Sequence, residues 1–92
     1  MSDSTLRERV MESLYAVLPK LLALSGQDAP RLSEQTRLME DLGMSSATTL
    51  ELMLELEEVL DVQLDVEEVQ PDDLASLGRL ADFVAGQMAV AG

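Results

Sequence analysis

The stretch that decides the fold is Leu42-Gly43-Met44-Ser45-Ser46-Ala47-Thr48-Thr49-Leu50-Glu51-Leu52, in which a glycine and two serines precede an apolar and acidic run. Serine is favoured just before a helix, because its hydroxyl accepts a backbone N–H group that the first turn leaves without a partner. From Thr49 onward, apolar residues recur at three- and four-residue steps, which places them on one side of a helix. The stretch therefore predicts a loop followed by a helix from about Ser46 to Leu60.

This predicted helix has two different faces. Its inward stripe consists of Thr49, Met53, Leu56 and Leu60, with Leu52 and Val59 beside it. Leu50 and Leu54 lie one turn apart on another face, among Glu51, Glu55 and Glu58. Glutamates four residues apart repel each other by roughly 0.2–0.5 kcal/mol, so stability alone does not explain this face. Exposed leucines among carboxylates favour a docking surface for a partner with Arg and Lys side chains. The alternative is that both leucines belong to the core.

The helical period also occurs upstream of this stretch. The residues Leu6, Val10, Leu14, Val17, Leu18 and Leu21 recur at helical steps. Ser4 is a fair N-cap, so we predict a helix from about Thr5 to about Leu24. Pro19 lies inside it, and an interior proline removes one backbone hydrogen bond and crowds the preceding turn. We expect a kink at Pro19 or an early end of the helix.

A long loop connects the two predicted helices. Turn residues begin at Ser25, and no sustained period appears before Ser45, although Leu32, Leu38 and Leu42 should be anchored inward. Loops longer than about 12 to 15 residues are uncommon in compact domains and are often functional.

Two further helices are predicted downstream. Asp65 should cap a short helix at about Val66 to Val69, which Pro71 ends. Ser76 should cap a last helix, whose inward side consists of Leu77, Leu80, Ala81, Val84 and Met88 and whose outward side carries Arg79, Asp82 and Gln87. The predicted fold class is all-α: a small four-helix bundle, with three longer helices and one short helix, that forms a single domain over residues 1–92.

Composition excludes several chemistries. The chain has no cysteine and no histidine, which removes cysteine nucleophiles, serine–histidine pairs and the usual zinc ligands. The run from Asp61 to Glu67 alternates oxygen-bearing side chains as a calcium loop does, but Val66 stands where such a loop needs glycine. We therefore expect no catalytic residue and no metal site, and hence no enzyme.

The charge of the chain is strongly negative, at -12. Twelve acids and no Lys or Arg occur between Leu38 and Gly78. Such a surface repels nucleic acid and anionic membranes, and it attracts a partner with a basic patch. The first residues lack the features of a signal peptide, and no apolar run approaches the ~18 residues of a membrane span. We expect a cytoplasmic monomer.

The core should be aliphatic, because Tyr15 and Phe83 are the only aromatic residues. Met39, Met44 and Met53 are expected to contribute to it, and methionine adapts to irregular gaps. We therefore expect the core to admit a short apolar chain between the helices.

The residues 41–47 (DLGMSSA), followed by Glu51-Leu52 and Leu56-Glu57-Glu58, resemble the acyl carrier protein family, whose second helix opens with Gly-x-Asp-Ser-Leu and continues through a Glu-Leu and a Leu-Glu-Glu. Residues 76–84 also look like the last helix of that family, so the resemblance covers nearly the whole chain. In that family the serine carries 4'-phosphopantetheine, and acyl or ketide chains are held as thioesters on the terminal thiol of this arm.

Carried over by position, the resemblance implies attachment at Ser46, which stands three residues after Gly43 and five before Glu51. Ser45 then takes the place of the family's aspartate, and Ala47 that of its leucine. A serine that begins a helix behind a long loop should be exposed, and the helix N-terminus favours a phosphate there. The alternatives are that either serine only caps the helix, or that Ser45 is the modified residue.

The resemblance also implies partners and a recognition helix. The implied partner-binding residues are Ala47, Leu50, Glu51, Leu54, Glu57 and Glu58. The implied partners are a phosphopantetheinyl transferase, which takes the arm from coenzyme A, and acyltransferases, ketosynthases or other biosynthetic enzymes with basic docking patches. Because Ser45 and Ala47 depart from the fatty acid type, polyketide or related natural product synthesis, such as antibiotic synthesis, is the preferred pathway. Fatty acid synthesis and peptidyl carriage are the alternatives, and a small acidic interaction or inhibitor protein without a cofactor is the rival from another class.

Overall fold

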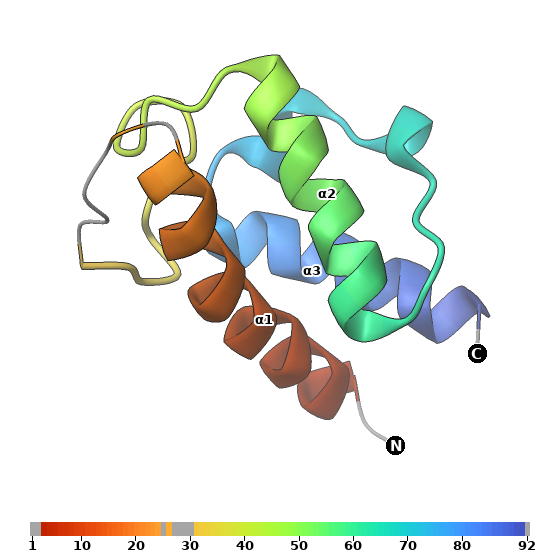
Figure 1. Ribbon diagram of the computed structural model, residues 1–92. Helices are drawn as coiled ribbons and strands as arrows, with labels where there is room; N and C mark the ends of the chain where they lie inside the picture. The colour runs from red at the N-terminus through yellow and green to blue at the C-terminus, as the bar shows by residue number, and fades with distance from the viewer. Residues whose placement is uncertain (1–2, 25, 27–30, 92) are drawn as a thin grey trace.

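The computed structural model describes residues 3–24, 26 and 31–91, and these residues form helices, short turns and loops, with no strand among them. The three α-helices are α1 (Asp3–Leu24), α2 (Ser46–Leu60) and α3 (Leu77–Ala91). α1 packs against both α2 and α3, and in Figure 1 α3 runs behind the other two helices. The all-helical fold class predicted from the sequence is confirmed. The helical period of the sequence also predicts both ends of α2 correctly.

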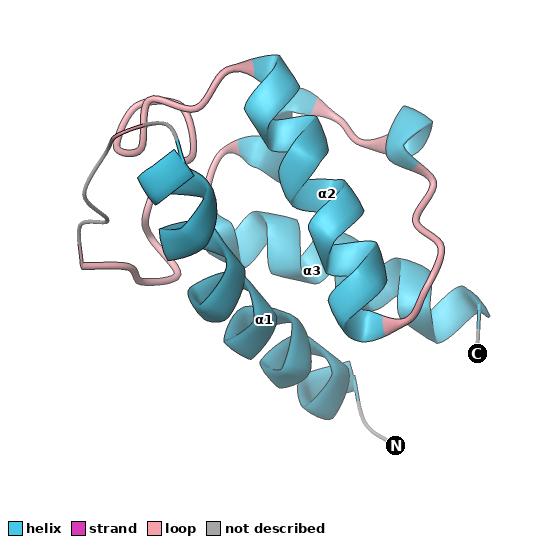
Figure 2. Cartoon of the chain, viewed as in Figure 1, coloured by secondary structure: helices cyan, strands magenta, loops and turns pink. Residues whose placement is uncertain are grey.

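The short helix predicted at about Val66 to Val69 is not an α-helix. In its place are two 3-10 turns, η1 (Val66–Glu68) and η2 (Pro71–Leu74), within the long connection between α2 and α3 that Figure 2 shows. Asp65 caps η1 as expected, because its carboxylate accepts the Glu67 N–H at 3.2 Å. The residue before Pro71 is held in an extended conformation, so no helix continues through it. The bundle of the described residues therefore has three α-helices rather than four.

α1 continues through Pro19 and ends at Leu24, so the early end that we considered does not occur. Pro19 has no N–H group to donate to the carbonyl of Tyr15, which removes one bond of the helix. Val17 and Leu18 on one side of it and Leu21 on the other are buried. Packing of this apolar face holds the helix together despite the missing hydrogen bond. The predicted cap Ser4 lies inside the helix, because α1 begins at Asp3.

The core is aliphatic, as predicted, and it draws on all three helices and on the first loop. Its largest fully buried side chains are Leu14, Leu18, Leu38, Leu52, Met53, Leu56, Leu77, Leu80, Val10 and Val84. Two predicted core residues are exposed instead. Val59 is 54% exposed, because it lies at the edge of the buried face in the last turn of α2, and Met39 is 47% exposed on the loop. Of the three methionines predicted to lie in the core, only Met44 and Met53 are buried.

The loop before α2 is fixed to the N-terminus of α3. The first N–H groups of a helix have no partner within it, and here Leu77 and Gly78 donate theirs to the carbonyls of Thr36 and Glu34, both at 2.9 Å. A side chain at Gly78 would lie 3.2 Å from the Glu34 carbonyl, so the glycine permits this close approach. Ser76 caps the same helix as predicted, accepting the Arg79 N–H at 3.2 Å.

Arg7 ties three elements together. Its guanidinium contacts Asp82 of α3 at 2.6 Å and also pairs with Glu34 of the loop. The two carboxylates that accept its hydrogen bonds raise the pKa of Arg7. The loop that leads into α2 is thus held by α1 and α3 together, which fixes where the first residues of α2 lie.

Candidate functional site

The two adjacent serines at the start of α2 have different roles. Ser45 is the N-cap: its hydroxyl accepts the Thr48 N–H at 3.2 Å, and its carbonyl accepts the N–H and the hydroxyl of Thr49, both at 2.9 Å. Ser46 is the first helical residue and is exposed, and its hydroxyl has no hydrogen-bond partner among the described residues. Capping, which the sequence left open between the two, therefore falls to Ser45. The hydroxyl of Ser46 is left free for chemistry.

A tight turn delivers the chain to this point. Gly43 has a φ of 63°, a left-handed conformation that glycine adopts without steric cost. The N–H groups of Gly43 and Met44 donate to the carbonyls of Met39 and Leu38, both at 3.1 Å. Leu42 and Met44 on either side of the glycine are buried. Because Leu42 and Met44 are held in the core, Ser45 and Ser46, which follow them, lie on the surface.

Asp41 stabilises the same turn. Its carboxylate accepts the Arg37 N–H at 2.8 Å and the Arg37 guanidinium at 3.3 Å. These two hydrogen bonds, the backbone one first, lower the pKa of Asp41. Arg37 also pairs with Glu40. Two of the twelve acids between Leu38 and Gly78 are thus compensated by a cation just outside that segment.

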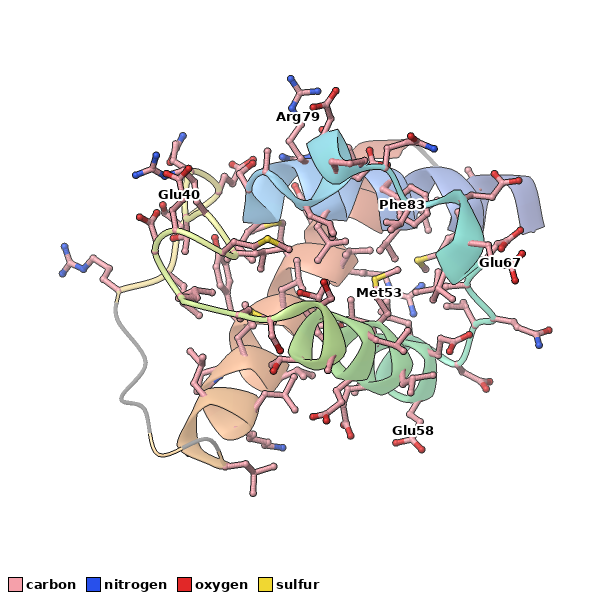
Figure 3. All side chains as sticks on the ribbon, turned by 90° about the horizontal axis from the view of Figure 1, so that it is seen from above. Glu40, Met53, Glu58, Glu67, Arg79 and Phe83 are labelled. Atoms are coloured by element: carbon pink, nitrogen blue, oxygen red, sulfur yellow. The ribbon has the colours of Figure 1, made fainter. Side chains whose placement is uncertain are left out.

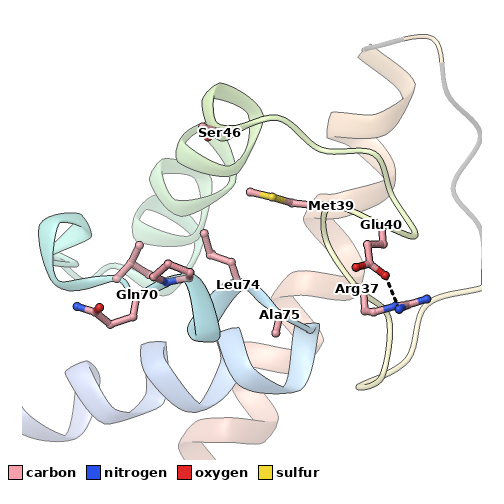
Figure 4. A pocket seen from close by; sticks show the side chains of 9 residues that line it. Arg37, Met39, Glu40, Ser46, Gln70, Leu74 and Ala75 are labelled. Carbon is pink, nitrogen blue, oxygen red and sulfur yellow. Dashed lines mark ion pairs between the residues drawn. The ribbon is translucent and has the colours of Figure 1, made fainter.

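A groove of about 490 Å³ opens beside Ser46. Figure 4 shows Ser46 at the top of α2, with Met39 and Leu74 near it and the Arg37–Glu40 ion pair at the far end. The residues that line it are Arg37, Met39, Glu40, Ser46, Val69, Gln70, Pro71, Leu74 and Ala75. The loop, α2 and η2 all contribute. Sequence reasoning missed this groove, and its only signal was apolar residues such as Met39 and Leu74 outside any helical period.

The start of α2 is electrostatically distinct within an acidic molecule. The first turn of the helix contains no acidic residue. The partial positive charge of the helix N-terminus is therefore not neutralised by a carboxylate of that turn. Backbone N–H groups and this dipole favour a negatively charged group at a residue such as Ser46.

The outward face of α2 carries most of the residues assigned to partner binding. Leu50 is 47% exposed and Leu54 is 52% exposed, which rules out the alternative that they belong to the core. Ala47, Glu51 and Glu58 are also exposed. These five residues lie on one continuous side of the helix that begins at Ser46.

Glu57 differs from the other residues of that set. It is half-buried, and its carboxylate accepts the Leu64 N–H at 2.7 Å. Its carbonyl accepts the Val62 N–H at 3.1 Å, where Asp61 turns the chain with a φ of 53°. Glu57 thus fastens the segment after α2 to the helix. It therefore has a role in the fold, and its predicted part in partner binding stays a prediction.

Among the described residues, no three His, Cys, Asp or Glu side chains are grouped so that they could hold a metal ion. In the same part of the chain, none of the helices has the length and apolar character to cross a membrane.

Comparison with known proteins agrees with this geometry. Residues 12–84 match the family model described as "Phosphopantetheine attachment site". An acyl carrier protein of Akkermansia muciniphila is 29% identical over 85 residues, covering 92% of this chain and 91% of that protein. An acyl carrier protein of Phytoplasma australiense is 36% identical over 55 residues, covering 60% of this chain and 68% of that protein. No solved structure matches the chain.

The family match places this helical bundle, which has an exposed serine hydroxyl beside a groove, among carrier proteins. The chain belongs to the acyl carrier protein family, because the family model spans most of its length. Its cofactor is 4'-phosphopantetheine, and like other acyl carrier proteins it has no catalytic activity of its own. Members of the family interact with biosynthetic enzymes.

Proposed function

We propose that 4'-phosphopantetheine is attached to Ser46. The observation that carries this proposal is the free, exposed hydroxyl of Ser46 at the first position of α2, next to a serine that already provides the cap. In attachment, Ser46 Oγ forms a bond to the phosphorus next to pantetheine in coenzyme A, the pyrophosphate bond breaks, adenosine 3',5'-bisphosphate leaves, and the hydroxyl loses its proton. Within the described residues no group accepts this proton from Ser46, so the transferase must supply the base.

The groove beside Ser46 supports a role in holding cargo. When bound, the arm supplies a terminal thiol that carries acyl or ketide chains as thioesters. Met39, Val69 and Leu74 offer an apolar surface close to the attachment point, and the exposed Met39 can adapt its shape. A short apolar cargo would find shelter here without opening the core. This differs from our expectation that the core itself admits the chain.

The outward face of α2 is proposed as the partner-binding surface. It consists of Ala47, Leu50, Glu51, Leu54 and Glu58, together with the half-buried Glu57, whose carboxylate also accepts the Leu64 N–H. The exposed leucines give a partner apolar surface to bury, and the glutamates attract its Lys and Arg side chains. The partners proposed are a phosphopantetheinyl transferase and acyltransferases, ketosynthases or related enzymes with basic docking patches.

Polyketide or related natural product synthesis remains the preferred pathway. It is supported by Ser45 and Ala47, which stand where the fatty acid type has aspartate and leucine. In this chain Ser45 performs the capping role that an aspartate would also perform, so the change leaves the fold of α2 intact. Fatty acid synthesis and peptidyl carriage are the alternatives. We also propose that residues 1–92 form one domain of this kind.

The decisive experiment is intact mass spectrometry after incubation with coenzyme A and a phosphopantetheinyl transferase of broad specificity. We expect the mass of one arm to be added to the wild type and to Ser45→Ala, and none to be added to Ser46→Ala. Circular dichroism of each variant checks that it is folded. Loss of modification in Ser45→Ala with retention in Ser46→Ala would assign the arm to Ser45 and contradict the proposal. No modification of any folded form would favour the acidic interaction protein.

A second experiment tests the groove. The melting temperature of the octanoyl form should exceed that of the form carrying the free thiol, because a sheltered chain binds only the folded state. Leu74→Asn, which places a polar amide in the groove, should reduce this difference. Equal melting temperatures for the two wild-type forms would rule out sheltering of the chain.

A further inference from the structure

A second groove, of about 540 Å³, lies between α3 and the segment that follows α2. None of its lining residues lines the groove beside Ser46. They are Gln63, Asp65, Glu68, Asp82, Phe83, Gly86 and Gln87. Figure 3 shows Phe83 on α3 and, on the segment that follows α2, Glu67, which is next in sequence to the lining residue Glu68. The proposed attachment of the arm makes no use of this region.

The wall of the second groove is fixed in position. The Gln87 side chain accepts the Asp65 N–H at 2.7 Å and donates to the Asp65 carbonyl at 3.3 Å. Leu64, one residue earlier, is buried, and Glu57 accepts its N–H. The segment is therefore fastened to both α3 and α2, and the groove exists before any partner binds. A preformed surface avoids the ordering cost that binding otherwise includes.

Gly86 is a glycine that the fold itself does not require. It lies inside α3, where glycine is less favourable than alanine. A side chain placed there would meet nothing within 4 Å, whereas one at Gly78 would make a tight contact of 3.2 Å with the Glu34 carbonyl. Gly78 is explained by packing within the molecule, and Gly86 is not. Its missing side chain keeps the floor of the groove open next to the Phe83 ring.

The charge of the groove selects the kind of occupant. Asp82 is paired with Arg7, but Asp65 and Glu68 have no Lys or Arg within ion-pair distance in the described part of the chain. No basic residue lines the groove. A second copy of this chain, with its net charge of -12, would be repelled. A cationic segment that also carries an apolar side chain would complement the Asp65 and Glu68 carboxylates and the space beside Phe83 and Gly86.

We propose that this groove is a second docking site, which binds a cationic, amphipathic segment of a partner protein. An apolar side chain of that segment lies over Phe83 and Gly86, and Lys or Arg side chains lie beside Asp65 and Glu68. The site is independent of the arm and of the outward face of α2. A carrier with two such surfaces can be held by one partner segment while α2 presents its arm to an enzyme.

The test uses a fluorescein-labelled amphipathic peptide with leucine on one helical face and lysine on the other, and a scrambled peptide of the same composition. Binding to the unmodified protein is measured by fluorescence anisotropy, in a Leu50→Ala/Leu54→Ala background that removes the apolar part of the α2 face. Gly86→Gln fills the floor, and Glu68→Gln removes one charge. Each should weaken binding about tenfold, the change typical of a residue at the centre of an interface. Glu12→Gln, the same charge change at an exposed position of α1 outside both surfaces, is the matched control.

Amide shifts in NMR spectra locate the peptide directly. We expect them at residues 63–68 and 83–87 in the same background. Circular dichroism melting confirms that Gly86→Gln and Glu68→Gln are folded. Equal binding of the scrambled peptide, equal effects of Glu12→Gln and Glu68→Gln, or shifts confined to α2 would each overturn the proposal. The outcome does not depend on whether Ser46 can be modified.

Discussion

The two faces of α2 carry the same residue type into opposite environments. Leu52 and Leu56 are completely buried, whereas Leu50 is 47% and Leu54 is 52% exposed. Burial of apolar surface stabilises by roughly 25 cal/mol per Å², so the fold gains fully from the first pair and only partly from the second. A partner that covers Leu50 and Leu54 would bury their remaining apolar surface, and this burial would stabilise the complex. One helix thus serves the core with one face and recognition with the other.

The largest effect on stability is expected from a substitution on the buried face of α2. Leu56→Ala should lower the free energy of unfolding by about 2–5 kcal/mol, because it leaves a cavity at a fully buried position. Leu54→Ala, the same change two residues away, should alter it by no more than about 0.5 kcal/mol. Urea unfolding followed by circular dichroism measures both. Similar losses for the two variants would show that the exposed face also supports the fold.

The next effect separates two adjacent glutamates. Glu57→Ala should lower the free energy of unfolding by about 1–2 kcal/mol, since the Leu64 N–H loses a charged acceptor. Glu58→Ala should leave stability nearly unchanged, because Glu58 is exposed and makes no hydrogen bond among the described residues. The same urea experiment compares them. If Glu58→Ala proved the more damaging variant, the structural role that we assign to Glu57 would be mistaken.

A smaller effect distinguishes the two serines. Ser45→Ala should cost about 1 kcal/mol, the usual value for loss of an N-cap. Ser46→Ala should change stability by less than about 0.5 kcal/mol, because its hydroxyl makes no bond among the described residues. Thermal unfolding of both variants gives the comparison. A larger loss in Ser46→Ala would mean that its hydroxyl serves the fold and is not free.

The sequence predicted those features that depend on neighbours along the chain. The bounds of α2, the caps Asp65 and Ser76, and the inward stripe of α3 all follow from periodicity and turn chemistry over a few residues. The exposed position of Ser46 followed from the same local reasoning. Short elements were less predictable, because a few residues around Pro71 contain too little pattern to separate an α-helix from 3-10 turns.

Features that depend on distant residues could not be predicted. Arg7 meets Glu34 and Asp82, and the Leu77 N–H meets the Thr36 carbonyl, across long separations in the sequence. No local signal marks such pairs. The groove beside Ser46 arises in the same way, because Met39 and Leu74 are brought together only by the packing of the loop and η2. The structural role of Glu57 was missed because its partner lies in the following segment.

The smallest expected effect concerns the acidic face itself. Glu55 is exposed, four residues after Glu51 and three before Glu58, so three negative charges lie along one side of α2. Glu55→Gln should raise the free energy of unfolding by roughly 0.2–0.5 kcal/mol, because it removes repulsion between like charges at helical spacing. Added salt should raise the melting temperature of the wild type and reduce its difference from Glu55→Gln, since screening weakens the same repulsion. Urea and thermal unfolding at low and high sodium chloride measure this difference. A gain that persists unchanged at high salt would come from helix propensity or packing, and repulsion on the recognition face would then not be its cause.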